Sequence, residues 1–502
     1  MKAVTKTLVL LIGAILLTLS GINWHIGVAA WIAPFLLLNF TRNVKWIYFI
    51  PFFIVVAISG MISQSCNNLF DLFTIDIING FSFAIFYSIS YLGDKLLYKK
   101  GSNFVYTLIF PSFIVIVEYL VSSKIGTWGV IAHTQLSFKP LIQISSITGL
   151  YGISFMVTWS ASVINRIFEQ KSIITGIRKG GIIYLTLFLA VVLYGIMKLQ
   201  TGDNNSKKVK IACIVSETDV HALVADNQET FKRLSDNYQL QVPDELFSDS
   251  TLIDSLISRT QKASDMGAKI IVWNEISLIL NQTQKQNLFS EIKAFCKTNQ
   301  VYVLLAFLEY LPSENNKPFY NKSVLINPGG DVSWEYSKSF LHPYAEAPVI
   351  NEGNYSIPYN DTEYGRIGNV ICADLDLPKY ISQAGKNSID IMLVPAFDWE
   401  GITPLHSQMA CLAAIQYGFT VIRSNGKGLS AVYDYKGKEV SSVNTFESNE
   451  KILMAEIPIK SKSTVYSKTG DILVYLGMAF IFLISVLRIL NTRSSAHNNR
   501  NS

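Results

Sequence analysis

Residues 366–378 read RIGNVICADLDLP, and this stretch decides the fold predicted for the polar part of the chain. Its first half is a short apolar run with β-branched residues, which is typical of a buried strand. The run closes on Cys372, whose side chain is a strong nucleophile when deprotonated. Because an α/β scaffold places its chemistry at strand ends and in the loops that follow, the stretch predicts a strand that carries a cysteine into a site.

Similar strand-like runs occur on both sides of this stretch, from about residue 207 to residue 462. They alternate with amphipathic stretches that favour helices, at 227–238, 250–266, 285–298 and 404–416. This alternation predicts an α/β layer fold. A binding domain without catalytic activity would give the same pattern, so the strands alone do not identify an enzyme. The other predicted strands are KVKIACIV, AKIIVWN, VYVLLAFLEYL, SVLINP, DIMLVPA, FTVIRSN and LSAVYDY.

Two more reactive side chains end strand-like runs: Glu275 closes AKIIVWNE and Lys338 ends SWEYSK. Together with Cys372 they would form a complete acyl-transfer site. The thiol is the nucleophile, the carboxylate accepts its proton and later that of an attacking amine, and the ammonium stabilises the thiolate and the oxyanion. Taken singly, each residue also has a purely structural interpretation. Cys372 could be a small core residue, Glu275 a charge at a helix N-terminus and Lys338 a solvated strand end. Cys213 lies in a similar run, IACIV, and serves as the core comparison.

The remaining polar chemistry of the sequence excludes several classes of protein. A net charge of +5, from 42 Lys and Arg against 37 Asp and Glu, is too small and scattered for a nucleic-acid binder. The odd number and wide spacing of the five cysteines indicate neither a disulfide framework nor a zinc site, and we expect no metal and no cofactor. A Cys–His pair is not expected, because Glu275 and Lys338 fill its roles. The histidines that such a pair would need are His221, His342 and His406, and the cysteines are Cys66, Cys213, Cys296, Cys372 and Cys411.

Half of the residues are hydrophobic and only 16% are charged, where a soluble domain carries about a quarter, so the chain is predicted to be a membrane protein. No cleavage site follows the first apolar run, which therefore indicates a retained helix. The first two runs are short and close together, and a tight hairpin or a partly re-entrant pair stays open for them. Eight spans are predicted, at 8–24, 26–40, 46–62, 77–93, 104–120, 144–165, 180–197 and 472–487.

The cations of the short connections predict the orientation in the membrane. Those near the predicted cytoplasmic side are Lys2, Lys6, Arg42, Lys45, Lys95, Lys99, Lys100, Arg166, Lys171, Arg178, Lys179, Arg488, Arg493 and Arg500. The alternate connections hold only Lys124 and Lys139. Both termini are therefore expected in the cytoplasm and the polar domain outside. The expected parts are helices one to seven at 1–200, a catalytic domain at 207–462, the last helix at 471–490 and a polar cytoplasmic tail at 491–502.

The strings around the three reactive residues resemble the nitrilase, or carbon–nitrogen hydrolase, superfamily with its Glu, Lys and Cys triad. YSKSFLHPYAEAP (336–348) resembles the motif YxKxxLVPFGEYxP of its membrane branch, the apolipoprotein N-acyltransferases. ICADLDLP (371–378) is similar to ICYExxFP around that branch's nucleophile. Residues 398–438 resemble the stretch that follows the nucleophile motif in that branch. VEYLVSSKIGTWGVIAHTQ (117–135) resembles the branch's segment from the fifth span into the following loop.

The resemblance implies a membrane domain of about eight spans and an extracytoplasmic α/β nitrilase-like αββα sandwich. It implies a catalytic triad of Glu275, Lys338 and Cys372, with Glu346 hydrogen-bonding near Lys338. The implied reaction transfers an acyl chain from a phospholipid through a thioester on Cys372 to the N-terminal amine of a diacylglyceryl-cysteine lipoprotein. The implied location is the bacterial cytoplasmic (inner) membrane, with the catalytic domain on the periplasmic side.

Three further residues are candidates for substrate binding or support. Asp374, with Ala373, stands where the family has Glu and Tyr after the nucleophile, and this departure makes the reaction class safer than the substrate. Glu118 lies within a predicted span, where an ionisable side chain is costly and usually functional, although a hydrated position near the outer boundary is the alternative. Trp128 follows as an interfacial anchor or as part of the lipid-binding region.

Two other functions stay open at this stage. A membrane-tethered amidase would use the same triad, but water would resolve the thioester. A lipoprotein-binding protein with a degenerate catalytic domain would keep the fold without the reaction.

Overall fold

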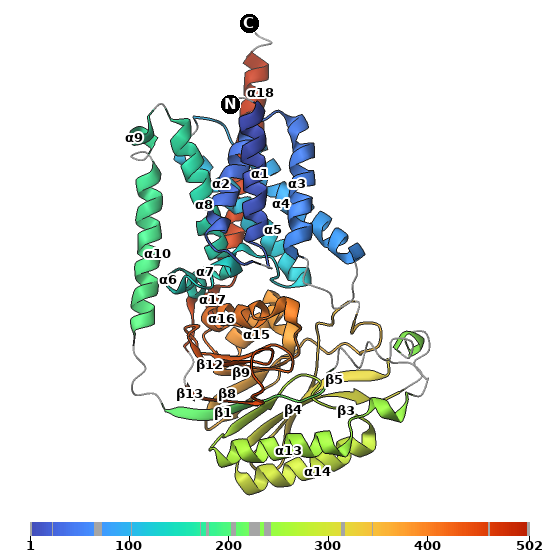
Figure 1. Ribbon diagram of the computed structural model, residues 1–502. Coiled ribbons are helices and arrows are strands. Elements are labelled where there is room, and N and C mark those ends of the chain that lie inside the picture. Colours follow the sequence, from blue (N-terminus) through green and yellow to red (C-terminus); the bar gives the residue numbers. More distant parts are fainter. Residues whose placement is uncertain are drawn as a thin grey trace. The chain divides into compact units, whose positions relative to one another are not determined.

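The chain divides into two compact units, residues 1–201 with 469–502 and residues 202–468 (Figure 1). The computed structural model describes residues 3–22, 24–64, 73–101, 103–170, 172–176, 180–201, 207–219, 231–234, 242–312, 317–343, 345–459 and 462–498. Cys66, His221 and most of the helix predicted at 227–238 lie outside the described residues.

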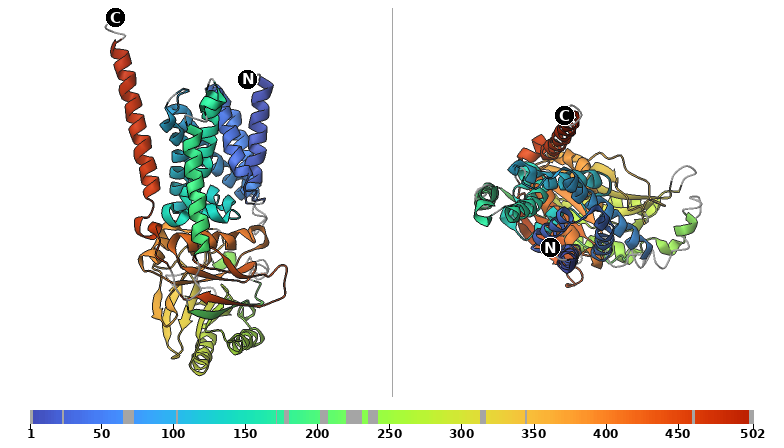
Figure 2. Two further views of the ribbon diagram at one scale, coloured as in Figure 1. Left: turned by 90° about the vertical axis from the view of Figure 1, so that its left-hand side faces the viewer. Right: turned by 90° about the horizontal axis from the view of Figure 1, so that it is seen from above.

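The first unit is helical, and a helix lies at each of the eight predicted spans. α1 begins and α18 ends at the same end of this unit (Figure 2). The helices are α1 (Ala3–Leu19), α2 (Ala29–Asn43), α3 (Phe49–Gln64), α4 (Phe73–Leu97), α5 (Ile109–Ile125), α8 (Leu150–Glu169), α10 (Ile182–Gln200) and α18 (Ile472–Asn498).

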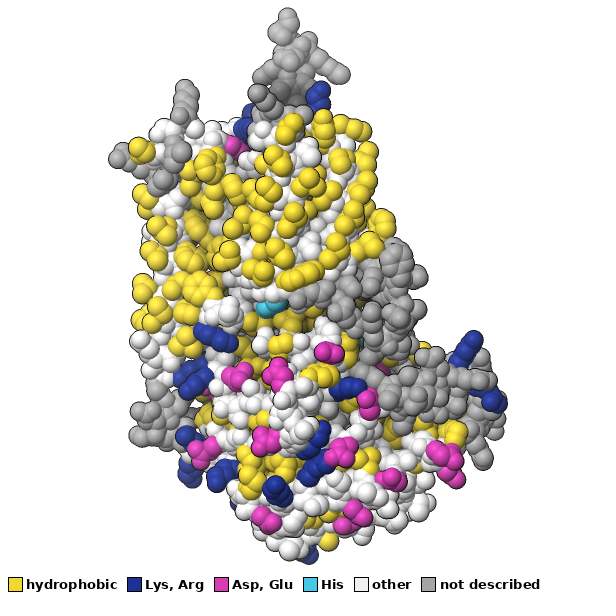
Figure 3. Space-filling model, viewed as in Figure 1, with side chains coloured by type: hydrophobic (Ala, Val, Ile, Leu, Met, Phe, Trp, Pro, Cys, Tyr) yellow, Lys and Arg dark blue, Asp and Glu magenta, His cyan; other side chains and the backbone are white. Residues whose placement is uncertain are grey.

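Apolar side chains cover much of the side of this helical unit that Figure 3 shows. On α10, for example, Leu185, Leu189 and Leu193 are 53%, 49% and 57% exposed. Exposed apolar surface on this scale is typical of a lipid-facing helix. Within the described residues, four segments are long and apolar enough to cross a membrane, namely Trp46–Ser63, Phe104–Ile125, Ile182–Gln200 and Ile472–Asn491. These features indicate that the helical unit is a membrane domain. The count of eight crossings stays a prediction.

The predicted span at 144–165 is interrupted. Gly149, at φ 69°, ends the short helix α7 (Ser145–Thr148), and α8 then starts at Leu150. The pair Lys139–Thr148 and Leu150–Glu169 is bent by 120° and would add a fifth candidate crossing if it forms one span. A positive φ costs glycine little, so this residue turns the chain where an apolar run by itself predicts a continuous helix.

The second unit has two mixed sheets, which confirms the predicted α/β layers. One sheet has the order β13-β1-β2-β4-β5-β6, with β3 beside β4, and the other has the order β12-β11-β10-β9-β8-β7. The strands of the first are β1 (Lys208–Ile214), β2 (Ile270–Trp273), β3 (Ile279–Leu280), β4 (Tyr302–Tyr310), β5 (Phe319–Ile326), β6 (Val332–Ser337) and β13 (Ile452–Pro458). Those of the second are β7 (Tyr359–Thr362), β8 (Gly365–Asn369), β9 (Ile391–Ala396), β10 (Thr420–Asn425), β11 (Leu429–Tyr433) and β12 (Glu439–Asn444).

Each sheet packs against helices on one face and the other sheet on the other face (Figure 1). α13 (Ser250–Asp265) and α14 (Gln282–Asn299) share a core with the first sheet, and α15 (Pro378–Lys386) and α16 (Leu405–Tyr417) lie on the side of the second. Strands covered on both faces bury every side chain, as β2, β9 and β10 do. The result is an αββα sandwich.

Candidate active site

Glu275, Lys338 and Cys372 reach one site from two different sheets. Glu275 follows β2 and Lys338 follows β6, both in the first sheet, whereas Cys372 follows β8 of the second. The backbone N–H of Glu275 donates to the carbonyl of Ala396 in β9 at 3.3 Å, which joins the two sheets next to the site. The three side chains are buried, at 2%, 4% and 6% exposure.

Lys338 is held by two carboxylates. Its Nζ lies 2.8 Å from Oε1 of Glu275 and 2.8 Å from Oε1 of Glu346. Asn321 donates to the same two oxygens, at 2.8 and 3.2 Å, and the backbone N–H of His342 donates to the other oxygen of Glu346 at 2.8 Å. Burial alone would lower the pKa of Lys338, but Glu275 and Glu346 raise it well above its usual range. The ammonium therefore stays charged, and both carboxylates have fixed orientations.

Cys372 lies at the first position of a short 3-10 turn (Cys372–Asp376), not inside the longer strand that the sequence predicts. β8 already ends at Asn369, and Cys372 adopts φ 48°, a left-handed conformation that is rare for a residue with a side chain. Burial, together with the negative charge of Glu275, raises the pKa of the thiol well above its usual range, and Lys338 and Arg423 act in the opposite direction. Such a thiol needs a nearby base to become a nucleophile, and Glu275, whose charge acts on the thiol, is the base that the family resemblance implies.

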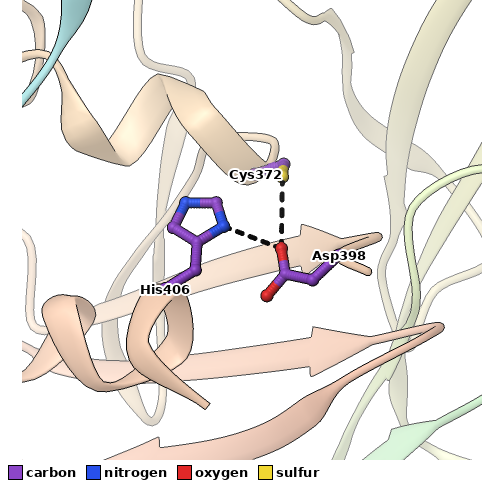
Figure 4. A group of neighbouring side chains, drawn as sticks. All are labelled: Cys372, Asp398 and His406. Carbon is purple, nitrogen blue, oxygen red and sulfur yellow. Dashed lines mark hydrogen bonds and ion pairs between the residues drawn. The ribbon is translucent and has the colours of Figure 1, made fainter. Parts of the chain in front are cut away.

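A second polar cluster lies beside the cysteine, formed by Asp398, His406 and Arg423. Figure 4 shows Asp398 between Cys372 and His406. Oδ1 of Asp398 is 4.0 Å from the Cys372 sulfur, 2.7 Å from Nδ1 of His406 and 2.9 Å from Nη2 of Arg423. The sequence places Asp398 and Arg423 in the family-like stretch 398–438 but predicts no role for either residue. Asp398 follows Phe397 at the end of the strand run DIMLVPA. The argument from strand ends that selects Cys372 therefore selects Asp398 as well.

The ligand atoms of Cys372, Asp398 and His406 lie within 4.8 Å of one another, a spacing that invites a test for a metal site. Nη2 of Arg423 is 2.9 Å from both Asp398 Oδ1 and His406 Nδ1, so a guanidinium already occupies the space between these donors. Nε2 of His406 lies 2.9 Å from Asp376. These residues do not fit a metal ion. Both ring nitrogens of His406 are engaged by carboxylates, Asp398 and Asp376.

Asp374 ties the lysine loop to the cysteine loop. Its carboxylate accepts hydrogen bonds from the Tyr336 hydroxyl at 2.6 Å and from the backbone N–H groups of Ser339, Phe340 and Ile371 at 3.1, 2.6 and 3.0 Å. Burial raises its pKa to about 6, and these hydrogen bonds oppose the rise. These contacts agree with the supporting role predicted for Asp374, and a contact with substrate stays a prediction.

We expect Asp374→Ala to destabilise the protein by at least about 2 kcal/mol, because four buried donors lose their acceptor. The measurement is the unfolding midpoint of the detergent-solubilised full chain. Asp361→Ala removes an exposed carboxylate, paired with Arg366, and should leave the midpoint unchanged. An Asp374→Ala protein with a wild-type midpoint and only a raised KM would instead favour the substrate-binding role.

The other two supporting candidates belong to the helical unit. Glu118 lies on α5, where its Oε1 accepts the backbone N–H of Ile131 at 2.9 Å. Trp128 lies half-buried in the turn after α5. Their roles in substrate binding stay predictions.

Comparisons with known proteins agree with this architecture. A model of the carbon–nitrogen hydrolase family matches residues 223–465, and a model of the apolipoprotein N-acyltransferase N-terminal domain matches residues 13–163. An apolipoprotein N-acyltransferase of Rickettsia prowazekii (strain Madrid E) is 23% identical over 494 residues, which cover 93% of this chain and 87% of the relative. Apolipoprotein N-acyltransferase 1 of Treponema denticola is 25% identical over 567 residues, with coverage of 96% and 95%.

A third relative, the apolipoprotein N-acyltransferase of Geobacter metallireducens, is 23% identical over 394 residues, which cover 74% of this chain and 71% of the relative. The two family models match the helical unit and the α/β unit in the order in which these occur in the chain. The α/β unit also brings together the Glu, Lys and Cys side chains that the resemblance selects. The chain therefore belongs to the apolipoprotein N-acyltransferase family.

Proposed function

We propose that Cys372 accepts an acyl chain from a phospholipid and that the thioester passes it to the N-terminal amine of a diacylglyceryl-cysteine lipoprotein. The observation that carries this proposal is the convergence of buried Glu275, Lys338 and Cys372 in a chain whose two units match this family. A thiol, a carboxylate and an ammonium are the groups that a two-step acyl transfer requires.

In the first step Glu275 takes the thiol proton while the sulfur attacks the ester carbonyl of the phospholipid. The carbonyl oxygen becomes an oxyanion, which the ammonium of Lys338 stabilises. The ester C–O bond then breaks, the leaving alkoxide takes the proton from Glu275, and a lysophospholipid departs. Cys372 is left as a thioester and Glu275 is again a carboxylate.

In the second step the lipoprotein amine attacks the thioester carbonyl and gives a proton to Glu275. The C–S bond breaks when the second tetrahedral intermediate collapses, and the proton returns to the sulfur. The product is an amide, and the enzyme is restored. The Glu275 carboxylate serves both steps, and its contact with Lys338 at 2.8 Å keeps it oriented throughout the cycle.

The membrane anchors explain how both substrates reach one thiol. We place the α/β unit on the periplasmic side of the inner membrane, since the cations predict cytoplasmic termini and since α1 begins and α18 ends at the same end of the helical unit (Figure 2). Moving an acyl chain into water costs about 0.8 kcal/mol per CH₂, so a site that meets membrane lipids by lateral diffusion avoids a large barrier.

The proposed function is tested by mass spectrometry of a lipoprotein N-terminus from cells with and without this protein. We expect an N-acyl group only in cells that carry the wild-type chain, and no restoration by Cys372→Ala. Release of free fatty acid or ammonia without N-acylation would instead identify a membrane-tethered amidase. Full activity of Cys372→Ala in vivo would identify a lipoprotein-binding protein without catalysis.

The orientation has its own test. Reporters inserted after Lys100 and after Lys179 should be cytoplasmic, because both follow cation-rich connections, and a reporter at Asn327 in the α/β unit should be outside. A cytoplasmic reading at Asn327 would overturn the orientation and leave the chemistry of the site untouched.

A further inference from the structure

Arg423 is a fully buried cation beside the reactive sulfur. It lies on β10 at 0% exposure, and its Nη2 donates to Oδ1 of Asp398 at 2.9 Å and to the Cys372 sulfur at 3.8 Å. Its Nε donates to Ser407 at 3.1 Å, while its Nη1 is buried with no hydrogen-bond partner among the described residues. Burying a guanidinium is costly, so a fully buried arginine that leaves one nitrogen unsatisfied and brings another to the sulfur calls for a functional explanation.

The two cations near the sulfur have different surroundings. Lys338 contacts two carboxylates at 2.8 Å, which offset much of its charge. Arg423 comes from the other sheet, and Asp398 is its one carboxylate ion-pair partner among the described residues. Its Nη2 also contacts His406 Nδ1 at 2.9 Å and donates to the sulfur itself. The groups that bear on the thiol are Glu275, Lys338 with Glu346, Asp374 and Asp376 of the turn, Asp398, His406 of α16, and Arg423.

We propose that Arg423 is a second cationic partner of the Cys372 sulfur, fixed by Asp398, and that it stabilises the thiolate in both steps of the reaction. This inference rests on the proposed role of Cys372. In acylation the cation favours loss of the thiol proton to Glu275. In the transfer step the sulfur leaves with the C–S electron pair, and the same cation stabilises it as a leaving group. Lys338 is then available for the carbonyl oxygen.

The test is the rate of Cys372 alkylation by iodoacetamide against pH, measured by peptide mass spectrometry on the detergent-solubilised full chain. We expect Arg423→Gln to raise the midpoint by about one pH unit, which is a tenfold lower rate at neutral pH. Arg423→Lys should recover part of the shift. Asp398→Asn should lower the midpoint, because it removes a negative charge near the sulfur while its amide oxygen still accepts from Nη2.

The midpoint is expected to rise in Arg423→Gln and to fall in Asp398→Asn, and these opposite directions distinguish an electrostatic role of Arg423 from a structural one. A loosened site would admit water to the thiol and lower both midpoints toward the ordinary value of about 8.5. Arg366→Gln, which breaks an exposed ion pair with Asp361, should leave the midpoint unchanged. The buried cysteines Cys213 and Cys411 report on folding, since they are alkylated only when the domain opens. If Arg423→Gln opens the domain, Arg423→Lys decides, with a raised midpoint expected.

An unchanged or lowered midpoint in the folded Arg423 variant would overturn this inference, even if Cys372 carries an acyl group. If the midpoints shift as expected but lipoproteins are not acylated, the proposed function fails, and Arg423 stands as a partner of the Cys372 thiolate without a role in acyl transfer.

Discussion

Cys372→Ala should abolish the acyl-enzyme and lower acyl transfer by at least about 10⁴-fold, the range seen when a nucleophile is removed from a preorganised site. Cys372 has a base candidate, Glu275, and two cations, Lys338 and Arg423, around one buried sulfur. The measurement is intact-mass detection of a thioester after incubation with a fluorescent phospholipid, together with the single-turnover rate.

Cys213 is the matched control. It is fully buried in β1. Burial raises the pKa of its thiol to about 12, and a hydrogen bond with Ser424 acts in the opposite direction, whereas two cations act on Cys372. Cys213→Ala should therefore cost about 1 to 2 kcal/mol of packing or less, without loss of the thioester. Detection of the acyl group on Cys213 or Cys411 would overturn the assignment of the nucleophile.

Glu275→Gln and Lys338→Met should both slow acylation, but with different pH dependence. Gln keeps the shape of the side chain and loses its basicity, so the variant depends on the small fraction of spontaneous thiolate. That fraction rises tenfold per pH unit below the thiol pKa, so the defect of Glu275→Gln shrinks as pH rises. Burial raises the pKa of Cys372 well above its usual range, so the recovery continues beyond the ordinary thiol pKa of about 8.5.

Lys338→Met removes the cation that holds the oxyanion and leaves Glu275 and Glu346 as buried carboxylates without it. High pH repairs only the ionisation of the thiol, so a penalty on the order of 3 kcal/mol should persist. Lys322 is the matched control, because it also contacts two carboxylates, Glu309 at 2.6 Å and Glu335, away from the site. Lys322→Met should leave the acylation rate unchanged.

The measurement for both variants is the single-turnover acylation rate of Cys372 against pH. Equal, pH-independent defects would mean that the two roles are wrongly assigned. A Glu275→Gln enzyme with the wild-type rate would remove this residue from the site.

The sequence predicts the buried strands well because their apolar runs are continuous. β2, β9 and β10 are buried at every position, whereas β12 is nowhere fully buried, so its sequence has no apolar pattern to detect. Similarly, the prediction of one helix across Gly149 fails because the φ of a glycine is not encoded by hydropathy.

The residues of the site differ in the same way in how far the sequence predicts them. Glu275 and Cys372 can be selected because reactive residues that follow apolar runs are conspicuous, and Lys338 is selected on the weaker signal of a strand end. Asp398, His406 and Arg423 come together only when two strands of the second sheet and α16 are placed side by side. Their mutual contacts depend on tertiary packing, and a single chain read in order does not contain that information.

The division of the site between two sheets has a consequence for how this enzyme can vary. The spacing between nucleophile and base is set by the thickness of the layer between the sheets, where Ser424 of β10 donates to the Ile214 carbonyl of β1 at 3.2 Å. A bulkier side chain in that layer, for example at Gly426, where a Cβ would lie 2.4 Å from Asn274, would change the reactive distance without touching a reacting group. Substitutions in that layer are therefore expected to alter the reaction rate, although they lie outside the three reactive residues.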